Sequence, residues 1–181
     1  MVFASAEPPT AATNSLAVAS VAGSLVRHDS LDVDPGTAFL AGVLHDVGKL
    51  VLLDVAPQTY TNCVVGSTGD VPTIVTEQEL FGTDHSIIGN LFAETWELSG
   101  QIQTAISQHH STFPAEDVSE LTQSIQLANQ LVKAWGIGQE ESTDICEATN
   151  LWLNERDEKS QEMIRANAAE SFEETKALLS S

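Results

Sequence analysis

Apolar residues recur every three or four positions along most of the chain, a spacing that is typical of amphipathic helices. Asp34 followed by Pro35 predicts the start of one helix, while Ser99-Gly100 and Gly136 predict the ends of two others. No stretch of four or more residues alternates between apolar and polar with hairpin dipeptides at its flanks. The pattern therefore predicts an all-α fold, a compact bundle of many helices. The predicted helices cover about residues 14–26, 35–53, 57–65, 72–81, 85–98, 101–110, 121–135, 141–153 and 157–179.

The predicted helix 35–53 is the most hydrophobic one, and its apolar stripe is so wide that residues 37–53 are expected to be buried on most sides. Gly42 and Gly48 interrupt it. Because glycine inside a helix costs up to about 1 kcal/mol relative to alanine, each is expected to mark close packing, a kink or a helix end. Trp96 and Trp135 fall on apolar stripes of later helices and are expected in the core.

The length of 181 residues is that of one globular domain, which can bury a core without the help of a metal or a disulfide. Residues 1–11 are mostly small residues and prolines without periodicity, and they are predicted to be a disordered or cut N-terminal arm. Residues 12–181 are predicted to form one helical domain, in which the acidic helices within 139–181 are more loosely attached.

The charge balance limits the partners of the chain. With 26 acidic and 7 basic side chains the formal net charge is -19, which repels phosphate backbones and anionic lipids. Neither a nucleic-acid partner nor a membrane partner is therefore expected, and no apolar run approaches the roughly 20 residues that span a bilayer. Cys63 and Cys146 stand far apart outside any C-x-x-C spacing, so they are interpreted as free thiols of a reducing, cytoplasmic compartment.

Four of the five histidines fall in the pairs His45-Asp46, Asp84-His85 and His109-His110. Any one of them is explained by ordinary hydrogen bonds within a fold, although an ionised Asp46 inside the most hydrophobic helix needs a partner. Taken together, imidazole and carboxylate groups are the usual ligands of a divalent transition metal. The candidate metal ligands are His45, Asp46, His85, His109 and His110.

Residues 38–52, AFLAGVLHDVGKLVL, resemble the central motif of the HD superfamily of metal-dependent phosphohydrolases. Residues 79–85, ELFGTDH, followed by Gly89, by WEL at 96–98 and by AISQHH at 105–110, resemble its HDOD branch. The HDOD pattern reads E-x-x-x-x-G-x-x-H, then W-x-L, then A-I-x-x-H-H. The chain is thereby identified as a member of the HDOD family over about residues 14–153. The resemblance also implies that the N-terminal helices of a full module are lacking here.

The resemblance also implies which positions hold metal in HD enzymes: an early His, the HD pair and a late Asp. Here Asn14 stands where the early His is expected and Asn129 where the late Asp is expected. Amides are poor ligands for transition metals, so the standard site is degenerate. Asp46, His85, His109 and His110 match the second metal site of the related HD-GYP proteins, which leaves a mononuclear site as the alternative.

The resemblance implies a non-catalytic bacterial signal-transduction module that contacts other signalling proteins or domains and holds no tightly bound cofactor. The alternatives are a metal-dependent phosphohydrolase or phosphodiesterase with one divalent transition metal, and an acidic adaptor that binds a basic partner through its C-terminal helices. An uncovered apolar surface around Leu16, Leu25 and Phe39 would also favour self-association into a homo-oligomer.

Overall fold

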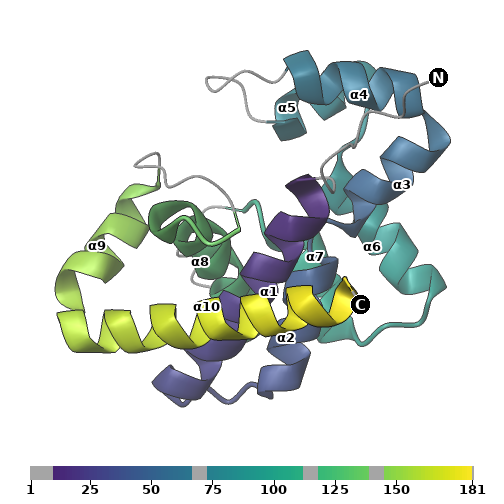
Figure 1. Cartoon of the computed structure of the whole chain (residues 1–181). Helices are drawn as coiled ribbons and strands as arrows, with labels where there is room; N and C mark the ends of the chain where they lie inside the picture. The colour runs from purple at the N-terminus through teal and green to yellow at the C-terminus, as the bar shows by residue number, and fades with distance from the viewer. Residues whose placement is uncertain (1–9, 67–72, 112–117, 139–144, 181) are drawn as a thin grey trace.

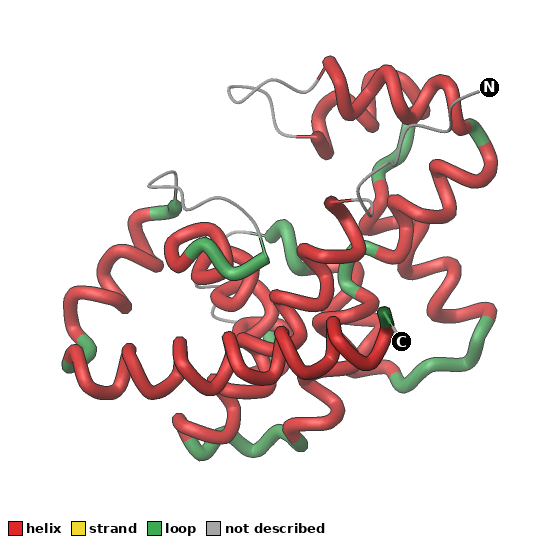
Figure 2. Tube along the Cα trace, viewed as in Figure 1, coloured by secondary structure: helices red, strands yellow, loops and turns green. Residues whose placement is uncertain are grey.

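The computed structural model describes residues 10–66, 73–111, 118–138 and 145–180, and these residues are almost entirely helical (Figure 1). Figure 2 shows no strand in this part of the chain, so the predicted all-α fold is confirmed. Most of the predicted N-terminal arm lies outside the described residues. The helices are α1 (Thr10–Asp29), α2 (Pro35–Leu44), α3 (Val47–Val55), α4 (Pro57–Gly66), α5 (Thr73–Phe81), α6 (His85–Thr95), α7 (Gly100–Gln108), α8 (Glu120–Trp135), α9 (Glu147–Glu155) and α10 (Glu158–Leu179).

Helix α1 is the centre of the core and packs against α2, α8 and α10. Its small residues let the neighbouring helices approach closely, and a Cβ on Gly42 of α2 would lie only 2.4 Å from the Cα of Ala19. The largest fully buried core side chains include Leu25, Ile106, Leu121, Ile125, Leu131 and Ile164. Glycine at position 42 therefore marks close packing, one of the three roles expected for it.

The segment predicted as one helix over 35–53 is two helices, because the chain turns at His45 and Asp46 between α2 and α3. α2 packs on α1, whereas α3 packs on α6. α2 also contacts α7 and α8, and α3 also contacts α4, yet several apolar side chains of this segment reach solvent. The expected burial of 37–53 on most sides is therefore met only in part. Apolar side chains exposed along this segment are Leu40, Val43, Leu50 and Leu53.

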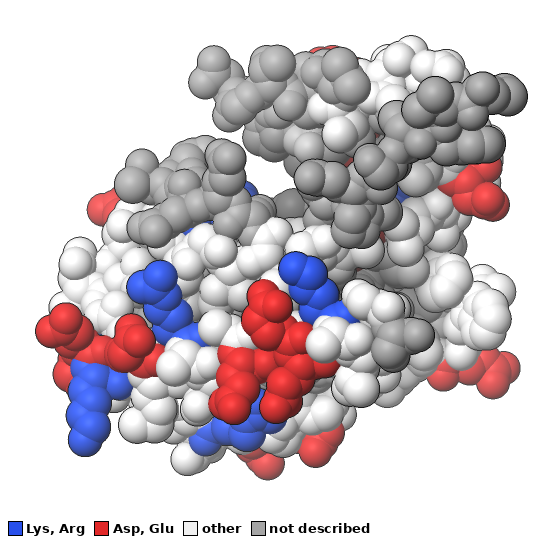
Figure 3. Space-filling model, viewed as in Figure 1, with Lys and Arg blue, Asp and Glu red and all other residues white. Residues whose placement is uncertain are grey.

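The last helix contributes to the same core as α1. Ile164, Ala168 and Phe172 of α10 are buried there. The looser attachment expected for the acidic helices within 139–181 stays a prediction. Gly138, which precedes the undescribed stretch 139–144, has a φ of +71°, and a Cβ there would lie 3.0 Å from the ring of Phe172. The acidic and basic side chains of α10 point outward along the face that Figure 3 shows.

Two expected core residues differ in their surroundings. Trp135 is buried, as predicted, with 9% of its surface exposed. Trp96 is 68% exposed and stacks on Phe92, so its predicted place in the core is wrong. The reason is that α6 ends at Thr95 and the chain turns away at Glu97, whose φ is +52°.

Candidate metal centre

The candidate ligands come from three places that are distant in sequence. His45 and Asp46 form the turn between α2 and α3, His85 is the first residue of α6, and His109-His110 follow the end of α7. The side chain of Asp84 caps α6 by accepting hydrogen bonds from the backbone N–H groups of Ser86 and Ile87, which fixes where His85 starts the helix. Glycine at position 48 allows α3 to approach α6, because a Cβ there would lie 1.9 Å from the carbonyl oxygen of His85.

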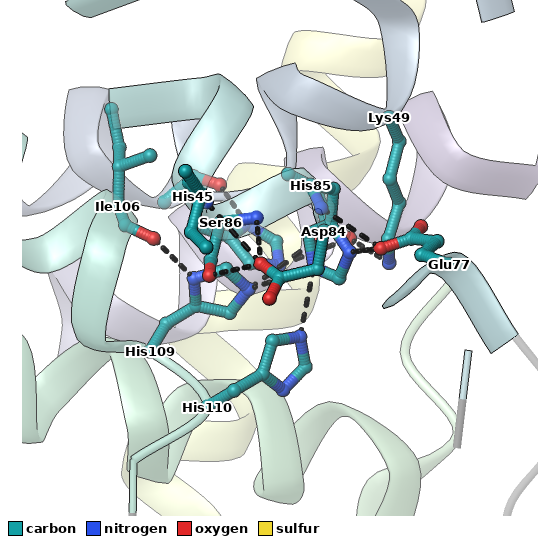
Figure 4. Close-up of polar contacts among 12 residues, drawn as sticks. His45, Lys49, Glu77, Asp84, His85, Ser86, Ile106, His109 and His110 are labelled. Carbon is teal, nitrogen blue, oxygen red and sulfur yellow. Dashed lines mark hydrogen bonds and ion pairs between the residues drawn. The ribbon is translucent and has the colours of Figure 1, made fainter. Parts of the chain in front are cut away.

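Four of these side chains converge. One ligand atom from each of Asp46, His85, His109 and His110 lies within 4.8 Å of the others. The Nε2 of His85 is 2.8 Å from the Nε2 of His110 and 3.3 Å from that of His109. Asp46 Oδ1 lies 3.2 Å from His85 Nε2 and 3.4 Å from His109 Nε2. Figure 4 shows the three imidazole rings turned toward one another.

Outer hydrogen bonds fix the orientation of these rings. His109 donates from Nδ1 to the carbonyl oxygen of Ile106 at 2.7 Å, and His85 donates from Nδ1 to Oε2 of Glu77 at 2.5 Å. Because both acceptors require a proton on Nδ1, the Nε2 atoms face the centre of the cluster. This combination of an inward Nε2 and an outward Nδ1–H to a carboxylate or carbonyl is typical of histidines that bind metals.

The electrostatics of the cluster keep Asp46 ionised and two imidazoles neutral. Burial alone would raise the pKa of Asp46, but the adjacent His45, the nearby His109 and His85, and Lys49 hold that pKa well below its usual value. Burial lowers the pKa of His45 to about 4. The ring of His110 is only partly buried, and this partial burial together with the neighbouring His109 and His85 lowers its pKa to about 2. Neutral imidazole and ionised carboxylate are the forms that bind metals.

The pKa of His85 is shifted the other way. Burial lowers it, but the close contacts of the ring with the carboxylates of Asp46 and Glu77 outweigh burial and raise the pKa above its ordinary value. A proton on the His85 imidazole therefore places a positive charge beside Asp46. A cation bound in the cluster would place its charge at the same position.

The donor set fits a divalent ion. Asp46 Oδ1 is buried and makes no hydrogen bond, while its Oδ2 accepts one from Lys49 Nζ at 2.7 Å. A buried carboxylate oxygen without a donor, facing imidazole nitrogens, is the arrangement that a bound cation would satisfy. Asp46, His85, His109 and His110 are the residues that would hold it, and only His110 is solvent-exposed.

His45, the fifth candidate, stands beside this group. Its Nδ1 donates to the carbonyl oxygen of Gly42 at 2.8 Å, and its Nε2 lies 3.3 Å from Asp46 Oδ2, on the carboxylate oxygen that also binds Lys49. Its ring meets that of His109 edge-on, with centroids 5.0 Å apart. His45 therefore lies nearest Oδ2 of Asp46, whereas His85 and His109 lie nearest Oδ1.

Sequence analysis missed Glu77, which is completely buried on α5 and holds His85. The motif contains the signal: counted back from His85, the first position of E-x-x-x-x-G-x-x-H is residue 77, and not the exposed Glu79 with which the segment ELFGTDH begins. Asn14 and Asn129, the two amides at degenerate positions, make no side-chain hydrogen bond within the described part of the chain.

Comparison with known proteins gives a family and a fold. The family model described as HDOD domain matches residues 6–112, more than half of the chain. No curated protein matches the chain.

Among solved structures, a protein of Marinobacter aquaeolei provisionally described as a signal transduction protein aligns with a TM-score of 0.71 at 19% identity, covering 93% of this chain and 39% of its own. A provisionally described phosphohydrolase of Shewanella amazonensis aligns with a TM-score of 0.65 at 20% identity, covering 96% of this chain and 62% of its own. The response regulator MmoQ of Methylococcus capsulatus aligns with a TM-score of 0.67 at 21% identity, covering 86% of this chain and 60% of its own. The chain thus spans less than two thirds of each of these structures, and at such identities the likeness shows a shared fold.

Proposed function

The chain belongs to the HDOD domain family, and on this basis we propose that it is a non-catalytic regulatory module of bacterial signal transduction, built around one metal ion. The observation that carries the proposal is the convergence of Asp46, His85, His109 and His110 on one point. This departs from the expectation of a module without bound metal. The four ligand atoms face one another, and Asp46 Oδ1 makes no hydrogen bond, so a bound cation accounts for the cluster better than a hydrogen-bonded network does.

A single ion in this cluster would have a structural effect. Four nitrogen and oxygen ligands complete the tetrahedral coordination that zinc prefers in structural sites, whereas catalytic zinc sites have three protein ligands and an open position. The ligands belong to the α2–α3 turn, the start of α6 and the end of α7. An ion there would supply positive charge that holds these three parts together.

Charge argues against a phosphodiester substrate. The basic group next to the cluster is Lys49, and its Nζ already binds Asp46 at 2.7 Å. Phosphoryl transfer needs cations on the phosphate oxygens, and Asn14 and Asn129 would not retain a second ion. The formal net charge of -19 adds a general repulsion of phosphate.

The surface supports a role in protein contacts. Leu16 and Phe39 line an apolar groove of about 400 Å³ beside Asp46, and the groove reaches Leu179 at the end of α10. Leu25, expected in the same uncovered surface, is buried with 1% exposure. Contiguous exposed apolar surface usually marks contacts with other proteins, so other signalling domains are the proposed partners, and self-association remains a prediction.

We propose a cytoplasmic location, because Cys63 and Cys146 are not joined in a disulfide and because of the family. Separately, none of the described helices combines the length and the apolar character needed to cross a membrane.

A mononuclear phosphohydrolase is the second candidate function. The exposure of His110 favours it, because solvent reaches the cluster on that side. A metal with more than four ligand positions would keep room there for water.

Elemental analysis of untagged protein, combined with a phosphodiesterase assay, tests the proposal. We expect about one ion per chain in the wild type, loss of the ion in Asp46→Ala, and no metal-dependent hydrolysis of a generic phosphodiester. Asp54→Ala is the matched control, since Asp54 is an exposed acid on the same helix region. Hydrolysis that Asp46→Ala abolishes would replace the regulatory proposal with the enzymatic one, and a metal-free wild type would remove the ion from it.

A further inference from the structure

The one tyrosine of the chain has an unusual place. Tyr60 is 5% exposed, although its neighbours on α4, Thr59 and Thr61, face solvent. Its hydroxyl donates a hydrogen bond to Oε1 of Glu77 at 3.1 Å, from one helix of the α4–α5 pair to the other. Burial and the neighbouring Glu77 raise the pKa of the phenol, so it stays protonated and able to donate.

Glu77 carries this contact onward to the cluster. Its Oε2 accepts a hydrogen bond from the backbone N–H of His85 at 2.8 Å and another from His85 Nδ1 at 2.5 Å. Both carboxylate oxygens are thus in use, one toward Tyr60 and one toward His85. A carboxylate held from both sides has a fixed plane, whereas one held from a single side can turn about its last bond.

From this chain of contacts we infer that Tyr60 is a positioning residue, which sets the ring of His85 through Glu77 and thereby couples the α4–α5 pair to the histidine cluster. The inference deepens the proposed function and rests on it as far as metal affinity is concerned. The positioning of His85 itself can be measured in the metal-free protein.

The placement of α4 and α5 gives this contact its importance. Figure 1 shows the two helices set apart from the bundle, above α3 and α6. α4 packs on α3 and α5, and Glu77 is the buried residue of α5. A partner or ligand that displaces the pair would withdraw Glu77 from His85. By the reciprocity of linked equilibria, occupation of the cluster would in turn hold α4 and α5 in place.

The test uses the whole chain with Tyr60→Phe, which removes one hydroxyl and keeps the ring. Glu77→Gln is the stronger perturbation, and Gln58→Ala is the control, because Gln58 is exposed on α4 and bonds only Asn62 among the contacts of its side chain. Zinc affinity is measured by competition with a chromogenic chelator. Loss of a group that orients a metal ligand costs roughly 10- to 100-fold in affinity, so we expect that range for Glu77→Gln, about three- to tenfold for Tyr60→Phe, and no change for Gln58→Ala.

Two further readouts separate this inference from the metal site. Nitrogen-15 spectra of the metal-free protein should show His85 with its proton on Nδ1 in the wild type, and a shifted or broadened signal in Tyr60→Phe. Zinc should slow amide exchange in α4 and α5 of the wild type but much less in Glu77→Gln. Circular dichroism confirms that each variant is folded.

The outcomes are distinguishable. An unchanged His85 signal in Tyr60→Phe would overturn the inference, whatever the metal affinity. If the His85 signal changes in Tyr60→Phe but the wild type binds no zinc, the positioning role is supported and the metal site is refuted. A changed signal together with weaker zinc binding would support both.

Discussion

Substitution of Gly48 by alanine is the sharpest perturbation of the packing that builds the cluster. The new Cβ would lie 1.9 Å from the carbonyl oxygen of His85 and 2.7 Å from the amide nitrogen of Gly89. Ordinary contacts of a Cβ begin at 3.4 Å, so α3 and α6 would have to separate by roughly 1.5 Å. Both obstructing atoms belong to the backbone of α6 and cannot move away as a flexible side chain would.

The expected cost follows from this geometry. Overpacked cores typically lose 1–3 kcal/mol, and a clash between two backbones should reach the upper end, about 3 kcal/mol. For a chain of this size that corresponds to a fall of roughly 6–12 °C in Tm. Since Asp46 and His85 lie on opposite sides of the contact, the same separation should also weaken zinc binding.

Urea denaturation followed by circular dichroism measures the free energy of unfolding. Gly100→Ala is the matched control, because Gly100 is exposed and a Cβ there would meet nothing within 4 Å. We expect the control to be neutral or slightly stabilising. Equal stability of the two alanine variants would refute the close contact between α3 and α6.

Three further predictions test other parts of the account. Phe172→Ala should lower the free energy of unfolding by about 3–5 kcal/mol, because the ring is buried between α10 and Gly138. Met163→Ala, on the exposed side of α10, should change this free energy little. Equally small effects of both substitutions would show that α10 is not part of the core. Burial raises the pKa of Asp29, but the bidentate contact with Arg156 and the neighbouring His28 lower this pKa overall. The Asp29–Arg156 ion pair therefore stabilises the fold above pH 4 by about 1 kcal/mol, and this contribution disappears as the pH falls through the lowered pKa. Thermal melts from pH 7 to pH 3 should therefore show a steeper loss for the wild type than for Asp29→Asn, and parallel curves would contradict the pairing. A chelator should lower the Tm of zinc-loaded wild type by roughly 5–10 °C, since zinc at 100 times its Kd contributes about 2.7 kcal/mol to stability. The Tm of His109→Ala should not change, and an equal fall in both proteins would place the zinc elsewhere.

Local signals predicted the helices well. Asp34 accepts a hydrogen bond from the backbone N–H of Thr37 with Pro35 in the first turn, and Gly136 ends α8 in the left-handed conformation, as their residue types indicate. These ends depend on chemistry within a few residues. Sequence is sufficient for such features because the hydrogen-bonding groups involved are neighbours in the chain.

The break between α2 and α3 depends on more distant contacts. Beyond Pro35 at its start, the apolar run 35–53 has no proline, and its pattern places His45-Asp46 as a polar pair inside one helix. The turn lies where the chain passes from α2, which packs mainly on α1, to α3, which packs mainly on α6. A pattern with helical period cannot contain that information.

Much of the cluster was foreseeable as a list of residues but not as a geometry. The resemblance to HD motifs pointed to Asp46, His85, His109 and His110, whereas the separation of His45 from them depends on which way each ring turns. From its residue type, Glu77 would be expected at the surface. It is buried and holds His85 only because α4, α5 and α6 meet around it. Trp96 shows the opposite case, an apolar residue left outside because its helix ends one residue earlier.

The central claim is that one ion, and only one, is held by four side chains from three parts of the chain. Anomalous diffraction from zinc-loaded crystals at the zinc absorption edge tests it most directly, because each ion appears as a separate peak. The account predicts one peak, bound by Asp46 Oδ1 and the Nε2 atoms of His85, His109 and His110. Two adjacent peaks bridged by Asp46, or a single peak bound elsewhere, would contradict it.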